Sequence, residues 1–297
     1  MNKLLKLQSN IFLLISIIGL VLAYGLDPRE NIVIMMIALG CIVVMGVPHG
    51  SLDVLFARQT FEITHLKNWV KFITYYLIAA MSIILFWIFL PNVFFVTFLI
   101  LSALHFSDDL NLLNFTILKL SYGASIITLP SLLFSHQLID LYAMIIEKQT
   151  ATSLVNISQL IAVLITLLLA VQLLNKRINI RTKLETISVW SIFLLLHPII
   201  AFGIYFCVMH STRHLIRSHF FLRKFSSKAF INALILPTVA VIMMGILVWW
   251  LGTNKDLEED IIRIIFVGLA ALTLPHAWVL QKSNFLAWSI LRISRND

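Results

Sequence analysis

Charged residues are scarce in this sequence of 297 residues. Asp, Glu, Lys and Arg together make up 12% of it, whereas hydrophobic residues make up 60%. Soluble domains carry about 25% charged residues, so this composition excludes an ordinary soluble fold. It predicts a protein of the all-α class: a polytopic bundle of transmembrane helices that forms a single domain over residues 1–297.

Cysteine, glycine and proline are also few. The two cysteines, Cys41 and Cys207, both lie in apolar runs. We therefore expect two buried thiols and no disulfide framework. The 10 glycines and 7 prolines are scattered, and no alternating pattern of ten-residue strands accompanies them, so a β-barrel is not expected.

Several motifs that would define a function are absent. The sequence has no H-E-x-x-H, which argues against a zinc protease of that class. It has neither the H-x-x-H-H box of diiron desaturases nor a glycine-rich phosphate loop. No lysine lies in the middle of an apolar run, where a retinal Schiff base would form, so a rhodopsin is not expected.

Apolar runs long enough to cross a bilayer, about 20 residues, recur along the chain. We predict nine spans, within a range of eight to ten, and no separate soluble domain. A short segment, Gln137–Ile146, is expected to lie in the interface or to re-enter the membrane. The predicted spans are 11–26, 31–48, 69–90, 92–107, 113–134, 152–174, 186–210, 229–251 and 261–281.

The net charge of +8 indicates membrane orientation rather than nucleic-acid binding, because the basic residues fall in short loops between apolar runs. Lys3, Lys6 and the basic segment 175–183 are expected inside, and the acidic segment 256–260 outside. The basic C-terminal segment 282–295 is also expected inside. We therefore predict a multi-pass protein of the inner or plasma membrane with both termini in the cytoplasm.

One conflict follows from this topology. Residues 213–228 are basic as well, yet a single span at 186–210 would place them on the opposite side from 175–183. The same span would separate His210 from the other histidines that end apolar runs. We expect the histidines to converge, so one crossing between residues 110 and 210 is miscounted. The alternative is that some of the arginines are functional.

The most informative polar stretch is HPIIAFGIYFCVMHSTRH, residues 197–214. His210 and His214 are four residues apart, so on a helix their rings lie on one face, as two ligands of one metal would. Polar rings at membrane depth need partners and are functional candidates. Tyr205 lies nearby, and Arg213 is expected to pair with an acidic group: Asp53, Asp109 or lipid phosphate.

Two further histidines share a spacing with an acidic residue. His49 precedes Asp53, and His105 precedes Asp109, by four residues each. On a continuous helix the carboxylate could hold the far nitrogen of a metal-bound ring. A simple turn at His49 and a solvated acidic loop after His105 remain the alternatives.

Two histidines adjoin prolines. His197 precedes Pro198 and is more than three turns from His210, which favours a structural or supporting role over a ligand. His276 follows Pro275, which frees a backbone carbonyl that a histidine could occupy. For His276 the roles of ligand, supporting residue and structural residue all remain open.

Together, PHGSLD, LHFSDD, HPIIAFGIYFCVMHSTRH and LPH resemble, in this order, the Brp/Blh family over about residues 41–281. These are bacterial and archaeal membrane β-carotene 15,15′-dioxygenases. The resemblance implies a non-haem iron enzyme, with Fe(2+) and O2, that cleaves β-carotene at its central double bond into two all-trans retinals. The product often supplies a rhodopsin. Such a substrate has no polar handle, so a tunnel must select it by shape.

The resemblance assigns the iron ligands to His49, His105, His210 and His214. The stretch after His105 departs from the family pattern, because Ser107-Asp108-Asp109 stands where a glycine-bearing stretch is expected. The residues expected to support the ligands are Asp53, Asp109, His197, His276, Tyr205 and Arg213.

Two other functions remain open. One is another membrane non-haem metal oxygenase or hydroxylase that acts on a lipid. The other is a transporter of a metal or small molecule, which would predict an inverted repeat; none is visible in the sequence.

Overall fold

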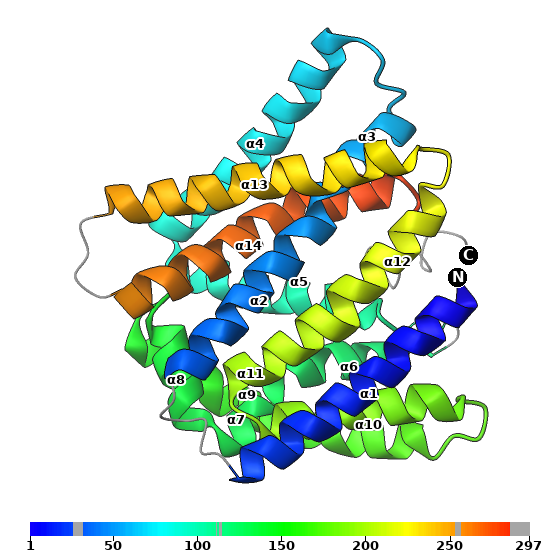
Figure 1. Cartoon of the computed structure of the whole chain (residues 1–297). Helices are drawn as coiled ribbons and strands as arrows, with labels where there is room; N and C mark the ends of the chain where they lie inside the picture. The colour runs from blue at the N-terminus through cyan, green and yellow to red at the C-terminus, as the bar shows by residue number, and fades with distance from the viewer. Residues whose placement is uncertain (26–31, 111, 113–114, 253–256, 286–297) are drawn as a thin grey trace.

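A computed structural model describes residues 1–25, 32–110, 112, 115–252 and 257–285, all as helices and the turns between them, without a strand in these ranges (Figure 1). Of the predicted topological markers, Asp256 and the basic residues beyond 285 lie outside these ranges. The side chain of His49 is also outside the described part, although its backbone belongs to a helix.

The helices follow one another with short connections. Their bounds are α1 (Asn2–Gly25), α2 (Ile32–Ser51), α3 (Asp53–Thr60), α4 (Leu66–Phe89), α5 (Pro91–Ser107), α6 (Thr116–Thr128), α7 (Pro130–Leu133), α8 (Ser135–Ala143), α9 (Lys148–Leu173), α10 (Ile180–Leu195), α11 (Pro198–Ile204), η1 (Tyr205–Ser211), α12 (Thr212–Phe221), α13 (Ser227–Leu251) and α14 (Leu257–Lys282).

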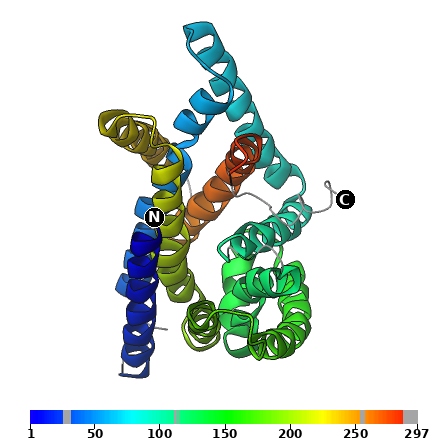
Figure 2. The ribbon, with the colours of Figure 1, turned by 90° about the vertical axis from the view of Figure 1, so that its right-hand side faces the viewer.

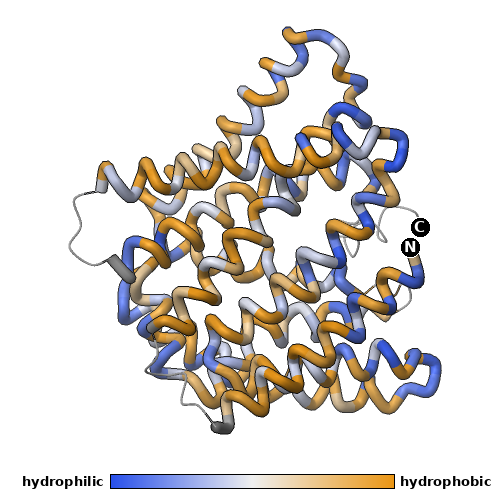
Figure 3. Tube along the Cα trace, viewed as in Figure 1, coloured by the Kyte–Doolittle hydropathy of each residue, from blue (hydrophilic) through white to orange (hydrophobic). Residues whose placement is uncertain are grey.

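The chain is a multi-pass membrane protein. Within the described ranges, 8 segments are long and apolar enough to cross a bilayer, and α5 is a shorter apolar helix. Hydrophobic residues make up most of the length of these helices, and hydrophilic residues gather at many of their ends (Figure 3). Large apolar residues such as Leu167 and Val239 are exposed, which is favourable against lipid. This confirms the predicted all-α polytopic bundle.

The predicted span at 186–210 is wrong. Helix α10 ends at Leu195 and α11 begins at Pro198, with Leu196 and His197 in extended conformations between them. Proline lacks the N–H that a continuing helix needs, and it pushes the preceding residue out of the helical region. The break therefore follows from the His197-Pro198 pair.

This break reverses the direction of the chain. Helix α10 and the continuous unit α11–η1–α12 run in opposite directions, so the unit returns to the side where α10 and α1 begin (Figure 1). The basic segments 175–183 and 213–228 thus lie at the same side of the bundle. This arrangement agrees with the expectation that one crossing between residues 110 and 210 is miscounted, which stays a prediction about the membrane topology.

The short segment expected not to span, Gln137–Ile146, corresponds to α8, which packs against α9. Both cysteines are free. Cys207 is buried as predicted, but Cys41 is exposed, because it lies on the outward face of α2. Burial of Cys41 was therefore a wrong prediction.

The core packs α5, α6 and η1 closely together. A Cβ at Gly123 of α6 would lie 2.0 Å from the backbone oxygen of Ala103 on α5, so only glycine allows this approach. Tyr122, Phe193 and Tyr205 are fully or almost fully buried in the same core. The end of α5 is thereby fixed against η1.

The reversal at His197-Pro198 predicts which loops share a side of the membrane. Cysteines introduced as Lys176→Cys and Lys224→Cys should be labelled by a membrane-impermeant thiol reagent from the same side. Glu147→Cys, at the opposite end of α9, should be labelled from the other side. Labelling of Lys176→Cys and Lys224→Cys from opposite sides would contradict the arrangement of α10 and α11.

Candidate metal centre

Four buried histidines converge where the ends of α5, η1, α12 and α14 meet. The ring centroids are 4.9 Å apart for His105 and His210, 6.1 Å for His105 and His276, and 5.3 Å for His214 and His276. Each residue is at most 7% exposed. Three of the four predicted ligands, His105, His210 and His214, thus belong to one cluster, which we call the histidine cluster.

His276 is the fourth member of the histidine cluster. The sequence left its role open among ligand, supporting residue and structural residue, and its ring lies between those of His105 and His214. His49 ends α2, and its side chain lies outside the described part of the chain. Among the described side chains, no group of three or more metal-binding residues has the arrangement of a formed metal site.

Asp109 holds one ring of the cluster. Its carboxylate oxygens lie 3.1 and 3.2 Å from Nδ1 of His210, and the hydroxyl of Tyr205 donates to Oδ2 at 2.5 Å. Arg213 and Arg217 both donate to the backbone oxygen of Asp109, at 3.2 Å each. Asp109 therefore joins the loop after α5 to η1 and α12.

Local helix geometry explains why Tyr205 and His210 reach the same carboxylate. They are five residues apart, which in an α-helix would turn them about 140° away from each other. Residues Tyr205–Ser211 instead form a π-helix, whose hydrogen bonds join residues five apart. The hydroxyl of Thr212 follows the same spacing, donating to the oxygen of Cys207 at 2.7 Å.

The electrostatics keep Asp109 ionised. Burial by itself would raise the pKa of its carboxyl group. Three neighbours outweigh burial and lower the pKa of Asp109 from 3.8 to about 2. His210 acts through its charge and a hydrogen bond, Tyr205 through a hydrogen bond, and Arg213 through its charge. Asp109 thus carries a negative charge beside the histidine cluster at neutral pH.

Asp53 holds a second ring. Its Oδ1 lies 2.7 Å from Nδ1 of His276, and Tyr76 of α4 donates to Oδ2 at 2.8 Å. Asp53 is 3% exposed. Asp53 therefore holds the Nδ1 atom of a histidine on α14, as Asp109 holds the Nδ1 atom of a histidine on η1.

The predicted pairing of Asp109 with His105 is not what the structure shows, and the predicted pairing of Asp53 with His49 involves a side chain outside the described part of the chain. The hydrogen bonds described for Asp53 and Asp109 go to His276 and His210. The physical reason is that neither pair lies on one continuous helix. Asp53 begins α3 after a break at Leu52, and Asp109 lies beyond the end of α5.

Arg213 contacts one of the groups that the sequence suggested, because it donates to the backbone oxygen of Asp109, but the carboxylate that it pairs with was not expected. Its guanidinium donates to both carboxylate oxygens of Glu185 on α10, at 2.7 and 3.2 Å, and to the side chain of Gln8 on α1 at 3.0 Å. Gln8 in turn donates to the backbone oxygen of Val208, within the π-helix, at 2.7 Å. Arg213 thus ties the helix of His214 to α1 and α10.

Glu185, Gln8 and Tyr76 were missed by reasoning from the sequence. Glu185 had a signal, because a carboxylate that starts an apolar run needs a buried partner. Gln8 and Tyr76 are unremarkable residue types in membrane helices, and only packing reveals their role. His197, predicted to be structural or supporting, lies away from the cluster, with its ring 6.3 Å from that of Phe134.

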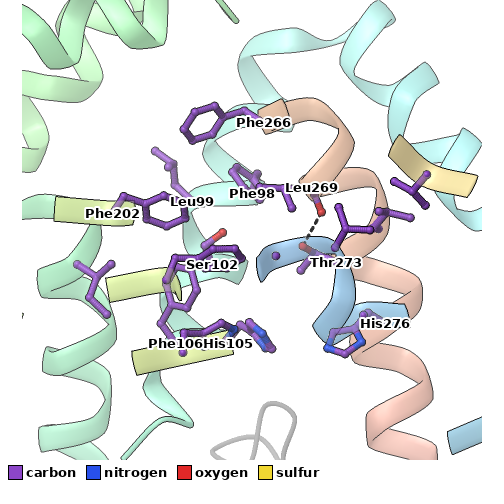
Figure 4. Close-up of a pocket in the computed structure, with 18 of the residues that line it drawn as sticks. Phe98, Leu99, Ser102, His105, Phe106, Phe202, Phe266, Leu269, Thr273 and His276 are labelled. Carbon is purple, nitrogen blue, oxygen red and sulfur yellow. Dashed lines mark hydrogen bonds between the residues drawn. The ribbon is translucent and has the colours of Figure 1, made fainter. Parts of the chain in front are cut away.

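The histidine cluster borders an apolar cavity of about 290 Å³. His105 and His276 lie at one side of it, below Phe98, Leu99 and Phe266 (Figure 4). His210 also lines the cavity, and the remaining walls are mainly aromatic and aliphatic. Such a space suits a hydrocarbon ligand whose reacting bond lies beside the imidazoles.

A family model and one known protein match most of the chain. The family model for beta-carotene 15,15′-dioxygenase matches residues 41–283. A beta-carotene 15,15′-dioxygenase of an uncultured marine bacterium is 26% identical over 257 residues, which cover 80% of this chain and 90% of that protein. A protein of Halobacterium salinarum named "Probable beta-carotene 15,15′-dioxygenase Blh" is 34% identical over 107 residues, 32% of this chain and 31% of its own length. No solved structure matches.

The buried pair of Arg213 and Glu185 predicts a stability effect. Glu185→Ala would leave the guanidinium buried without its carboxylate, a loss of about 3–5 kcal/mol. The melting temperature of the purified protein in detergent should therefore fall clearly. Glu259→Ala breaks a half-exposed pair with Arg263 and should cost about 0–1 kcal/mol. Equal melting temperatures for the two variants would contradict the role given to Glu185.

Proposed function

The chain belongs to the beta-carotene 15,15′-dioxygenase family, and from that premise we propose that its histidine cluster is the metal centre of a carotenoid-cleaving enzyme. The enzyme splits β-carotene at its central double bond into two molecules of retinal. The observation that carries the proposal for the site is the position of the histidine cluster in the wall of an apolar cavity. Buried imidazoles in contact with an apolar cavity suit a metal that acts on a hydrocarbon.

The ligands that we propose are His49, His105, His210 and His214, and His276 lies close enough to contribute. The residues present fit a metal. Nδ1 of His105 is buried without a hydrogen-bond partner among the described residues, as expected of an atom reserved for a ligand. In His210 and His276 the carboxylate holds Nδ1, so Nε2 is the atom that would bind.

We propose Fe(II) as the metal, because neutral imidazoles suit it. When bound, Fe(II) supplies the activation of O2, and the reaction of O2 with the 15,15′ double bond gives two aldehydes. The ligand set is neutral, so the charge of the ion is offset by Asp53 and Asp109, which also fix the orientation of their rings. Tyr76 and Tyr205 hold these carboxylates in turn.

The apolar walls bind and orient the substrate. β-Carotene offers no polar group, so only the shape of the cavity can set which bond lies beside the histidine cluster. Holding the reacting bond in one place supplies much of the catalytic advantage of such a site. The same walls exclude water from the centre.

We further propose that the protein lies in the cell membrane and that the side of the bundle with the histidine cluster faces the cytoplasm. Lys3, Lys6 and the basic segments 175–183 and 213–228 lie on that side, and positive residues favour the cytoplasmic face. Retinal would then be released within the bilayer, where a retinal-binding protein could take it up.

Removal of one cluster imidazole tests the activity. In a bacterium that accumulates β-carotene, the parent chain should bleach the cells and form retinal, as measured by chromatography. His210→Ala should abolish retinal formation while leaving the folded protein in the membrane. His65→Ala, an exposed position outside the cluster, is the control and should retain activity. Normal retinal yield from His210→Ala would rule out the assigned site.

Removal of one supporting carboxylate tests the metal centre itself. Asp53→Asn should weaken the affinity for Fe(II), or for Co(II) as a spectroscopic substitute, by about 10–100-fold, because the ring of His276 loses its partner. Asp140→Asn, on the exposed face of α8, should leave the affinity unchanged. Equal affinities in a metal titration of the two variants would show that the Asp53–His276 pair does not serve a metal.

A further inference from the structure

The walls of the cavity differ in exposure from one end to the other. At one end, Ile126, Phe193 and Ile199 are 1–2% exposed, so this end is closed by the protein core. At the other, Ile73 and Leu77 of α4 line the same cavity and are 49% and 54% exposed. Residues that line a cavity and are also half exposed mark its opening.

The arrangement of the helices places this opening. Helix α4 packs against α14 and α5, whereas α13 packs against α2 and α14. Figure 2 shows α14 lying between α4 and α13, which stand apart on either side of it. Pro237 and Val241 of α13 are only partly buried and line the same cavity as Ile73 and Leu77 of α4. The opening therefore lies between α4 and α13, above α14.

The surroundings of the opening are apolar. Both α4 and α13 have the length and hydropathy of membrane spans, and little of either is buried in the protein. Leu247 and Val248 on α13 and Ile78 and Met81 on α4 are exposed. In a membrane these side chains face lipid tails, so the opening connects the cavity with the interior of the bilayer rather than with water.

We propose that a lateral opening between α4 and α13 is the route by which the carotenoid enters from the bilayer and retinal leaves. This inference rests on the proposed function and adds the path of the substrate. A hydrocarbon dissolved in lipid would pass Ile73 and Leu77, then Tyr76, and reach the Asp53–His276 pair, whose ring lies at the cavity wall. It would meet water nowhere on this path.

Neighbouring residues on α4 provide a matched pair of variants. Leu77 lines the opening and Ile78 does not, yet both are aliphatic, adjacent and similarly exposed, at 54% and 58%. Leu77→Trp should obstruct the opening, whereas Ile78→Trp should only touch lipid. Val241→Trp and Val239→Trp form the corresponding pair on α13, where Val241 lines the cavity and Val239 is exposed outside it.

The experiment measures uptake of β-carotene from vesicles into the full-length, metal-free protein, followed by the circular dichroism that the polyene acquires in a chiral cavity. Leu77→Trp and Val241→Trp should slow the initial rate of uptake by about tenfold, which corresponds to ~1.4 kcal/mol of activation free energy. Their outward-facing controls should match the parent. Equal rates for lining and control variants on both helices would overturn the proposal.

Metal addition separates this inference from the proposed function. If the parent takes up β-carotene through the opening but forms no retinal after Fe(II) and O2 are supplied, the proposed function fails and the route stands. If retinal forms at the parental rate in Leu77→Trp and Val241→Trp, the function stands and the route fails.

Discussion

The structure depends on the need to pair buried charges inside a membrane protein. An isolated charge in a low-dielectric interior is costly, so each buried carboxylate near the cluster has several partners. The carboxylate of Asp109 accepts a hydrogen bond from Tyr205 and lies beside the ring of His210. Its backbone oxygen accepts hydrogen bonds from Arg213 and Arg217. Because these groups come from the loop after α5, from η1 and from α12, satisfying one charge fixes these three segments relative to one another.

The pairing also supports the proposed chemistry of the site. A carboxylate at Nδ1 orients an imidazole and presents Nε2, which is a common way to support a metal ligand. The Asp109–His210 and Asp53–His276 pairs repeat this device on two sides of one cluster. The π-helix contributes to this arrangement, since its wider turn brings Tyr205 and His210, which are five residues apart, to the same carboxylate.

Polar and apolar side chains line different parts of one cavity. The imidazoles of His105, His210 and His276 and the carboxylate of Asp53 line the cavity, while most of its other walls are aromatic and aliphatic. A site that must act on a hydrocarbon needs this division, because the substrate contributes only shape and the protein must supply every polar interaction. The half-exposed aliphatic residues of α4 extend the apolar surface to lipid without a polar barrier.

The sequence by itself determined the all-α membrane bundle, because hydrophobic runs and scarce charge allow little else. It also indicated His105, His210 and His214, since polar rings at membrane depth need a function, and the His197-Pro198 pair contained the signal for the helix break. Only the tertiary structure decided which partners meet. Asp53 and Asp109 bind histidines of other helices because helix ends interrupt the four-residue spacing, and contacts between distant segments such as Glu185 and Arg213 leave no local pattern.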